Sequence, residues 1–314
     1  MSGLRFGVIG AGSMGMNHLR VLSQMPGVEL CGLIEIEETR AQACSEQFGI
    51  PAWQEYRRLF GKVDAVSIVV PSSMHYDIAR DFLKHNVHVL VEKPITVDQA
   101  QARRLIELAK SRNLVLQVGH LERFNPAMTE LRKRIGKPLY LQACRMGLRT
   151  TRNLDVGVIW DLMIHDLDIM LNLVKSPIVD ISGVGQSVYS AHEDFASVRL
   201  TFKNGCVANL VASRISGHRA RTLTVMEADR NYHLDFMNQT LTVHEAAAAQ
   251  PQAIPVEKAE PLRLELEDFV DCVRTQREPE VTGLDGKRAL ELAIQAGNRM
   301  RMVGEPDALI AMAG

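Results

Sequence analysis

The spacing of three glycines near the start of the chain restricts the possible folds more than any other feature. Gly10, Gly12 and Gly15 follow the apolar run LRFGVIG and open the stretch MNHLRVLSQMPG, which has helical spacing. The run predicts a buried strand, and the stretch predicts a helix. In this context Gly-x-Gly-x-x-Gly is the fingerprint of a dinucleotide-binding turn. Gly10 allows the tight turn, Gly12 lets the backbone approach a pyrophosphate, and Gly15 lets helix and strand pack closely.

The residues around this turn predict which dinucleotide binds. The first backbone amides of the predicted helix, at Ser13 and Met14, face the negative charge of a pyrophosphate. Glu35 ends the second apolar run, VELCGLIE, about 20 residues after the glycines. A carboxylate there accepts hydrogen bonds from ribose hydroxyls and repels a 2′-phosphate, so we expect NAD in preference to NADP. Arg40 is expected to pair with Glu37 or to lie over the adenine, although it is also placed to contact a 2′-phosphate.

Apolar runs alternate with helical stretches up to about residue 120. The runs VELCGLIE, DAVSIVV, VHVLVEK and LVLQVGH are separated by EETRAQACSEQFG, EYRRLFG, HYDIARDFLKHN and VDQAQARRLIELAKSRN. Strands that are apolar on both faces and alternate with helices predict a parallel sheet covered by helices. We therefore predict a doubly wound Rossmann domain for residues 1–120.

The pattern changes in residues 121–314. A helix is predicted at NPAMTELRKRIG, a strand at PLYLQACRMG and a second helix from about Val158 to Val174. Strand-like runs without intervening helices follow, with Asn204-Gly205 as a hairpin turn, and two helices close the chain. We predict an α+β domain on a largely antiparallel open sheet. Helices on one face leave the other apolar face to be covered, so we expect a homodimer or homotetramer built through this sheet.

Length and composition exclude several function classes. The 314 residues exceed the size at which one core keeps growing, so two domains are expected. A formal net charge of −1 supplies no basic field for nucleic acid or an anionic membrane. The five cysteines and ten histidines show no metal-ligand spacing, and no apolar run is long enough to span a bilayer. Because a strand begins too early for a signal peptide, we expect a soluble cytoplasmic protein with reduced thiols.

The predicted helix at residues 158–174 carries the strongest candidates for chemistry. Its segment WDLMIHDLDIMLNLV is apolar almost all round, so most of its surface should be buried. Asp161, His165 and Asp168 recur at helical spacing and form one polar stripe. Buried ionisable groups are costly unless they pair or contact a ligand. The stripe is therefore interpreted either as an internal His–Asp hydrogen bond or as part of an active site.

Several segments resemble one family of oxidoreductases. GVIGAGSMG, VVPSSMHYDIA, VLVEKPIT, DLMIHDLD and PEVTGLDGKRALELA are similar to segments of the Gfo/Idh/MocA family. The resemblance implies that Lys93 lies in the active site beside the nicotinamide. It also implies that Asp161 and His165 on a second-domain helix complete the catalytic set. The residues that it places in the cofactor cleft are Pro71, Ser72, His75 and Glu92.

Oxidation of an alcohol needs a base for the hydroxyl proton and a hydride acceptor on the other side of the carbon. His165 is the preferred base, because an unperturbed imidazole has a pKa of about 6.5 and is available in its neutral form near pH 7. Lys93 then hydrogen-bonds the same oxygen and stabilises the developing alkoxide. Asp161 orients the histidine or binds a neighbouring hydroxyl. The residues leave open whether Lys93 or His165 accepts the proton.

Two further stretches are similar to one branch of the family. VGHLERFNPAM and RNLDVGVIWDLMIHDLDIML resemble enzymes that oxidise the 3-hydroxyl of UDP-N-acetylglucosamine to a ketone. In that branch a partner aminotransferase converts the ketone to an amine for lipid A assembly. The diphosphate of such a substrate needs cations, which Arg149, Arg152 and Arg214 offer in or beside loops. Arg123, at the domain junction, is placed to contact cofactor or substrate.

Two other functions remain open at this point. One is a dehydrogenase of cyclitols or free sugars, such as an inositol dehydrogenase. The other is a regulator that binds NAD(P) as a signal and catalyses no reaction. The presence of Lys93, Asp161 and His165 favours an enzyme over a regulator.

Overall fold

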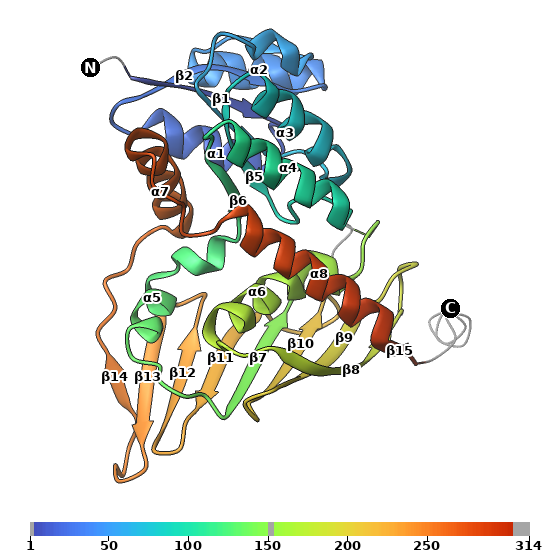
Figure 1. Ribbon diagram of the computed structural model, residues 1–314, viewed down its shortest axis with the longest axis vertical. Coiled ribbons are helices and arrows are strands. Elements are labelled where there is room, and N and C mark those ends of the chain that lie inside the picture. Colours follow the sequence, from blue (N-terminus) through green and yellow to red (C-terminus); the bar gives the residue numbers. More distant parts are fainter. Residues whose placement is uncertain (1–2, 150–153, 304–314) are drawn as a thin grey trace. The chain divides into compact units, whose positions relative to one another are not determined.

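The computed structural model describes residues 3–149 and 154–303, and it divides into two compact units (Figure 1). The first unit consists of Met1–Phe124 and Glu260–Leu290, and the second of Asn125–Ala259 and Glu291–Gly314. The first unit therefore includes a C-terminal segment that the sequence analysis placed in residues 121–314.

A six-stranded parallel sheet forms the centre of the first unit. The strand order is β3-β2-β1-β4-β5-β6, and every neighbouring pair is parallel. This order is that of a doubly wound dinucleotide-binding sheet and confirms the predicted Rossmann fold. The strands are β1 (Leu4–Ile9), β2 (Val28–Ile34), β3 (Ala52–Trp53), β4 (Ala65–Ile68), β5 (His88–Glu92) and β6 (Leu116–Gly119).

Four α-helices connect these strands. They are α1 (Ser13–Ser23), α2 (Glu38–Phe48), α3 (His75–Lys84) and α4 (Gln99–Ser111). Three short 3₁₀ helices, η1 (Tyr56–Leu59), η2 (Ser72–Met74) and η3 (Leu121–Phe124), complete this part. The stretch EYRRLFG, predicted as a helix, forms only η1, because the chain turns away at Phe60 and Gly61 with a φ of 74° at the glycine.

Helix α7 (Pro261–Thr275) belongs to the first unit because its apolar side chains complete that unit's core. Leu266 is buried, and the ring of Phe269 packs edge-on against Phe6 of β1 with centroids 5.8 Å apart. After α7 the chain runs beside β6, where the carbonyl of Val281 accepts a hydrogen bond from the amide of Val118 at 3.2 Å. Helix α8 (Gly283–Arg299) follows.

A nine-stranded sheet forms the centre of the second unit, in the order β14-β13-β12-β11-β7-β10-β9-β8-β15. The pairs β7–β10 and β8–β15 are parallel and the other pairs are antiparallel, which confirms a largely antiparallel sheet. The predicted hairpin turn joins β9 to β10, with a φ of 88° at Gly205. The strands are β7 (Tyr140–Met146), β8 (Ile178–Gln186), β9 (Phe195–Phe202), β10 (Val207–Ser213), β11 (Ala220–Met226), β12 (Arg230–Asp235), β13 (Thr240–Glu245), β14 (Gln252–Ile254) and β15 (Met300–Met302).

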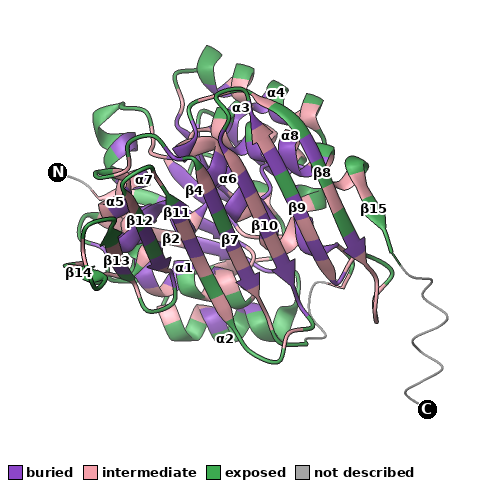
Figure 2. Cartoon of the chain, turned by 90° about the horizontal axis from the view of Figure 1, so that it is seen from below, coloured by how far each residue is buried: buried purple, intermediate pink, exposed green. Residues whose placement is uncertain are grey.

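The two faces of this sheet differ in polarity. Along the central strands buried and more exposed residues alternate, as the purple and the pink or green bands of Figure 2 show. The buried face meets α5 (Pro126–Arg132), which contacts β12 and β13, and a helical turn that contacts β10. The opposite face carries Gln142, Arg199 and Asn209. That face is more polar than the apolar face expected from the sequence.

The helix predicted from Val158 to Val174 is not a single α-helix. It begins with the π-helical turn η4 (Ile159–Met163) and continues as α6 (Ile164–Leu173). Glu193 directs this start, because its carboxylate accepts a hydrogen bond from the Ile159 amide at 3.1 Å. A side chain at Gly157 would collide with the same carboxylate. The wider turn therefore follows from a contact with a distant residue that helical periodicity does not reveal.

Asp194 organises the loop between β8 and β9. Its carboxylate accepts hydrogen bonds from the amides of Val188 and Tyr189, both at 2.8 Å, and from the Ser190 amide at 3.1 Å. Burial opposes ionisation of Asp194, but these donors hold the pKa of its carboxyl below the usual value. Its Oδ1 also lies 3.6 Å from Nε of Arg214, and both side chains are buried.

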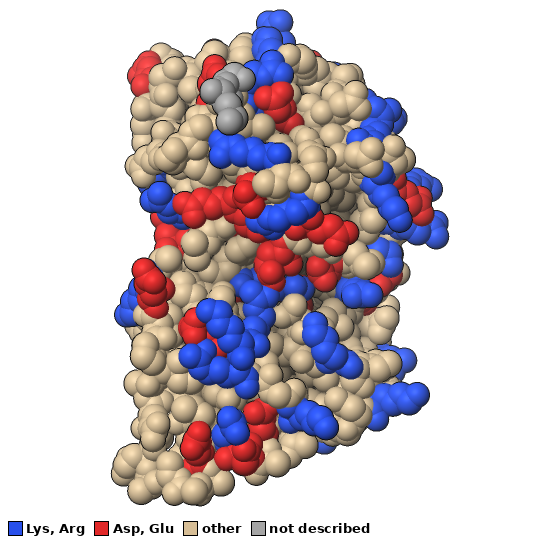
Figure 3. All heavy atoms as spheres, turned by 60° about the vertical axis from the view of Figure 1, so that its left-hand side comes forward, with Lys and Arg blue, Asp and Glu red and all other residues tan. Residues whose placement is uncertain are grey.

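The surface charges are mixed in sign (Figure 3), and the cysteines form no disulfide bonds. On the face drawn in Figure 3, acidic and basic side chains are interspersed, in keeping with a formal net charge of −1. All five cysteines are free thiols. Within the described ranges, no helix combines the length and the apolar character needed to cross a membrane.

Candidate functional site

The glycine turn between β1 and α1 has the geometry that a dinucleotide requires. Gly10 has a φ of 96°, and a side chain there would meet the Val69 backbone. A Cβ at Gly15 would overlap the Gly10 carbonyl oxygen, so α1 packs against β1 only with glycine at this position. A Cβ at Gly12 would meet no atom within 4 Å. Open space in front of Gly12 at the start of α1 fits a pyrophosphate that approaches the backbone amides.

Glu35 follows β2 and contacts this turn directly. Its side chain is only 7% exposed, and its Oε2 accepts a hydrogen bond from the Ala11 amide at 2.9 Å. Its Oε1 accepts a second hydrogen bond from the Glu37 amide at 3.0 Å. Arg40 pairs with Glu37, Nε to Oε2 at 3.4 Å, as expected, and lies 3.8 Å from Glu35. The carboxylate predicted to bind ribose is thus held against the glycine turn by two backbone amides.

Two further strands of the sheet bring candidate residues to the same edge. β4 and β5 lie beside β1 in the order β1-β4-β5, and all three are parallel, so their carboxyl ends meet. Pro71 precedes η2, which begins at Ser72, and Glu92 ends β5 immediately before Lys93. In doubly wound sheets ligands bind outside the carboxyl ends of the strands.

His75 connects the segments that follow β4 and β5. Its Nδ1 lies 2.8 Å from the Pro94 carbonyl oxygen and its Nε2 lies 2.9 Å from the Val70 carbonyl oxygen. The side chain is buried, and burial lowers its pKa although both carbonyls favour the charged ring. A neutral ring donates to only one of the two carbonyls. His75 therefore holds the Lys93-Pro94 turn, and its place in the cofactor cleft stays a prediction.

The contact of Arg123 with cofactor or substrate also stays a prediction. It is 4% exposed, its guanidinium lies 3.5 Å from Oδ1 of Asp285, and it donates to the Glu280 carbonyl at 3.5 Å. Asp285 in turn accepts from the hydroxyl of Thr282 at 2.7 Å. The described contacts of Arg123 therefore connect η3 to the segment before α8, within the first unit.

In the second unit, Asp161 and His165 lie on one continuous helical segment. Asp161 belongs to η4 and His165 to the first turn of α6, and both are half-buried. Asp168 is only 1% exposed. The polar stripe predicted from the sequence therefore splits into two half-buried residues, which stay accessible to a ligand, and one buried residue.

The residue beside His165 was not predicted from the sequence. Asp166 is 2% exposed and binds Arg145 of β7 through two hydrogen bonds, Nε to Oδ2 at 3.0 Å and Nη2 to Oδ1 at 2.8 Å. A buried, two-point arginine–carboxylate contact has a narrow range of geometries. It joins α6 to the sheet next to His165. An Asp at this position of an apolar helix was the only signal available in the sequence.

The three arginines proposed to bind a diphosphate have different surroundings. Arg149 is exposed, and its guanidinium lies 4.5 Å from the ring centroid of Tyr189. Arg214 is 2% exposed, contacts Asp194 and donates to the Val156 carbonyl. Arg152 lies outside the described residues. Arg149 is therefore the described member of this set that solvent and a ligand reach.

Comparison with family models supports the interpretation of both units. Residues 4–120 match the NAD-binding Rossmann domain of the Gfo/Idh/MocA oxidoreductase family. Residues 132–229 match the Gfo/Idh/MocA C-terminal domain.

Two relatives match nearly the whole chain. A UDP-N-acetylglucosamine 3-dehydrogenase of Acidithiobacillus ferrooxidans is 37% identical over 301 residues, which cover 93% of this chain and 96% of that protein. A scyllo-inositol 2-dehydrogenase (NAD(+)) of Bacillus subtilis is 29% identical over 95% of this chain and 94% of its own length.

Solved structures agree with these relatives. A structure of the Acidithiobacillus ferrooxidans enzyme superposes with a TM-score of 0.91 at 36% identity and covers 96% of this chain and 98% of that one. A 3-ketoreductase of Actinomadura kijaniata, solved with NADP, shares the fold with a TM-score of 0.85 at 18% identity. Sequence, family models and architecture thus agree that this chain belongs to the Gfo/Idh/MocA family of oxidoreductases.

Proposed function

We propose that the protein is an NAD-dependent dehydrogenase that oxidises the 3-hydroxyl of UDP-N-acetylglucosamine to a ketone. The main support is the 37% identity, over 93% of the chain, to an enzyme named for that reaction. Relatives with sugar and cyclitol substrates make it an oxidoreductase that acts on CH–OH groups. An aminotransferase that converts the ketone to an amine, as in lipid A assembly, is the proposed next step.

Different residues of this chain are proposed to carry out different parts of the reaction. NAD, when bound, supplies the hydride acceptor. His165 is the proposed acceptor of the hydroxyl proton, and Lys93 is the residue proposed to hydrogen-bond the alkoxide oxygen and to stabilise it. Asp161 binds the neighbouring hydroxyl or orients the imidazole. Arg149, exposed above Tyr189, is the described arginine proposed to meet the substrate diphosphate.

A second enzyme function has a specific observation in its favour. The 29% identity to a scyllo-inositol 2-dehydrogenase extends over 95% of the chain. NADH absorbance with UDP-N-acetylglucosamine and with inositols separates the two, provided that an aminotransferase and an amino donor remove the ketone. Turnover of an inositol but of no UDP-sugar would support the second function, and NAD binding without any turnover would support a regulator.

The first prediction separates two roles of the glycine turn, which are cofactor binding and helix packing. Gly12→Ala adds a methyl group in open space, so the thermal midpoint should stay unchanged while the KM for NAD rises about tenfold or more. Gly15→Ala forces the methyl group against the Gly10 carbonyl, so the midpoint itself should fall. Differential scanning fluorimetry and NADH titration of both variants measure the two effects. Equal destabilisation by both would show that the space at Gly12 is not a ligand site.

The second prediction concerns cofactor choice. The kcat/KM for NAD should exceed that for NADP, because the Glu35 carboxylate repels a 2′-phosphate. Glu35→Gln removes the charge but keeps an oxygen for the Ala11 amide, and it should reduce the preference by roughly tenfold. Glu46→Gln, at an exposed position of α2, is the matched control and should leave the ratio unchanged. If Glu35→Gln leaves the ratio of the two kcat/KM values unaltered, Glu35 does not contact the ribose.

The third prediction tests the catalytic assignment. His165→Ala and Lys93→Met should each lower kcat by roughly 10²–10⁴ and leave the affinity for NADH near its original value. His218→Ala, at an exposed position of the second unit, should change neither. Turnover, NADH binding and thermal midpoint are measured on the same samples. If His165→Ala lowers the thermal midpoint but leaves kcat normal, His165 has a structural role in the core and is not the base.

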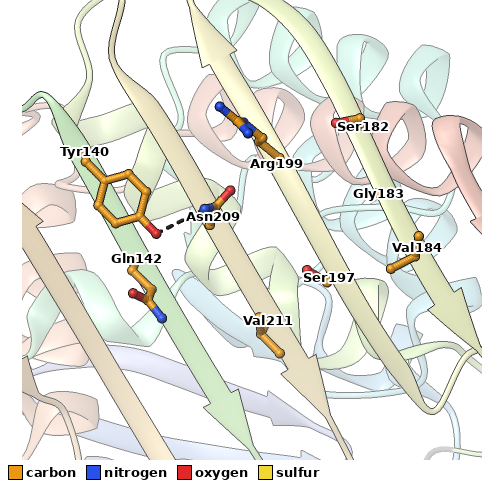
Figure 4. A pocket seen from close by; sticks show the side chains of 9 residues that line it. All are labelled: Tyr140, Gln142, Ser182, Gly183, Val184, Ser197, Arg199, Asn209 and Val211. Carbon is orange, nitrogen blue, oxygen red and sulfur yellow. Dashed lines mark hydrogen bonds between the residues drawn. The ribbon is translucent and has the colours of Figure 1, made fainter.

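The exposed face of the second unit's sheet supports a further proposal, that two or more chains associate through it. This face has a shallow hollow, and the side chain amide of Asn209 there donates to the Tyr140 hydroxyl at 3.0 Å (Figure 4). A second copy of the chain would cover half-buried side chains such as Val211. The residues that line the hollow are Tyr140, Gln142, Ser182, Gly183, Val184, Ser197, Arg199, Asn209 and Val211.

The fourth prediction is the mass of the particle. Light scattering at micromolar concentration should give twice or four times the 35.0 kDa of one chain. Val211→Glu places a charge on the exposed face and should reduce the mass to that of one chain. Met237→Glu, which adds the same charge at an exposed turn, should not. A wild-type particle of 35.0 kDa would contradict association.

A further inference from the structure

Three ionisable side chains gather in the core of the first unit. His18 of α1, Glu92 at the end of β5 and Glu265 of α7 each offer an atom within 4.8 Å of the other two. His18 and Glu265 are 0% exposed, and the Glu92 side chain is 12% exposed. The residues are far apart in the sequence, and we call them the His18–Glu92–Glu265 cluster. It lies next to Lys93, to which the proposed reaction assigns a direct role.

His18 and Glu92 are held in place by specific contacts. Nδ1 of His18 lies 2.8 Å from the Ser67 hydroxyl, and its Nε2 faces Oε1 of Glu92 at 3.4 Å. The other carboxylate oxygen of Glu92 accepts a hydrogen bond from the Lys93 amide at 3.2 Å. A side chain at Gly119 would stand 2.9 Å from the Glu92 carboxyl carbon, so the carboxylate fills the space left by that glycine.

Glu265 has no comparable partner for its charge. Among the described residues, none makes a hydrogen bond to either of its carboxylate oxygens. Gln117 of β6 donates to the Glu265 backbone carbonyl at 3.1 Å and not to the side chain. The two charged groups that raise the pKa of Glu265, Glu92 and Asp268, are both acidic. An ionised carboxylate in this position would be buried beside other negative charges, which is highly unfavourable.

The surroundings shift the pKa values of the Glu265 and Glu92 carboxyl groups in opposite directions. Burial, with the charges of Glu92 and Asp268, raises the pKa of Glu265 well above its ordinary value. Burial also opposes ionisation of Glu92, but His18 and Lys93 lower its pKa. Two neighbouring acids with pKa values moved apart are typical of a pair that holds a single proton.

We propose that Glu265 is protonated at neutral pH and donates a hydrogen bond to Glu92, so that the His18–Glu92–Glu265 cluster positions Lys93. The proton stays on the Glu265 carboxyl, and a small rotation of this group brings its hydroxyl to Glu92. Glu92 then accepts from Glu265 on one side and from the Lys93 amide on the other. Glu265 and His18 are positioning residues, and their effect on turnover rests on the role proposed for Lys93.

The charge state is tested without reference to activity. Infrared difference spectra at pH 7 should show the carbonyl stretch of a protonated carboxylic acid in the wild-type protein, and Glu265→Gln should remove it. Glu267→Gln, on the same helix with a side chain that is 42% exposed, is the matched control and should retain the band. Retention of the band in Glu265→Gln would overturn the proposal. So would one equivalent of a divalent metal ion in the purified protein, because the ion would replace the proton.

The fifth prediction concerns stability against pH. A carboxyl whose pKa is raised on folding contributes stability that is complete below its unfolded pKa and is lost as pH rises through its folded pKa. Above about pH 4.5, the ratio of folded to unfolded wild-type protein should therefore decrease as pH rises, by up to about tenfold per pH unit. The comparison is with the same ratio for Glu265→Gln, which carries no ionisable group at this position. Glu267→Gln should follow the wild type. Parallel profiles for the wild type and Glu265→Gln would overturn the proposal.

Kinetics test the positioning role. Glu265→Met, which cannot donate a hydrogen bond, should lower kcat at least tenfold and leave the KM for NAD unchanged. Glu265→Gln keeps a donor and should recover most of that loss. If the wild type, Glu265→Met and Glu265→Gln have equal kcat values, Glu265 does not position Lys93. If the wild-type protein oxidises no sugar at all, the proposed function fails, while the infrared and stability measurements still decide the state of Glu265.

Discussion

The close approach of α1 to β1 is the contact on which the first unit depends. It requires glycine at position 15, because any side chain there would overlap the Gly10 carbonyl. The contact directs the first amides of α1 to the turn after β1, where a pyrophosphate binds. It also places the next turns of the helix over the sheet, so that His18 reaches Ser67 and Glu92. One packing contact thus determines both the cofactor turn and the buried cluster.

Local patterns in the sequence were sufficient to predict much of this arrangement. Alternating buried runs and helices predicted the Rossmann unit, and the glycine spacing predicted the turn that the structure contains. Asn204-Gly205 predicted a hairpin turn, and the structure places Gly205 in it with a φ of 88°, which glycine adopts readily. The half-buried Asp161 and His165 lie on the predicted helical segment. Each of these features depends on residues within a few positions of one another.

Features that depend on distant partners could not be predicted. The sequence shows that Arg123 and Arg214 are charged, but not that Asp285 and Asp194 meet them in the interior. The π-helical turn follows from Glu193, more than thirty residues after the helix begins. Helix α7 has an ordinary amphipathic pattern, which fits either core. For the same reason Glu265 carried no signal in the sequence.

The position of α7 also affects how the chain folds during synthesis. The core around Phe6 and Leu19 includes Leu266 and Phe269, which follow strands β7 to β14 of the second-unit sheet in the sequence. Domains generally fold as they leave the ribosome, from the N-terminus onward. The core of the Rossmann unit is completed out of that order, because helix α7 is made after strand β14. The apolar surface that Leu266 and Phe269 cover therefore lacks these partners until strands β7 to β14 have been translated.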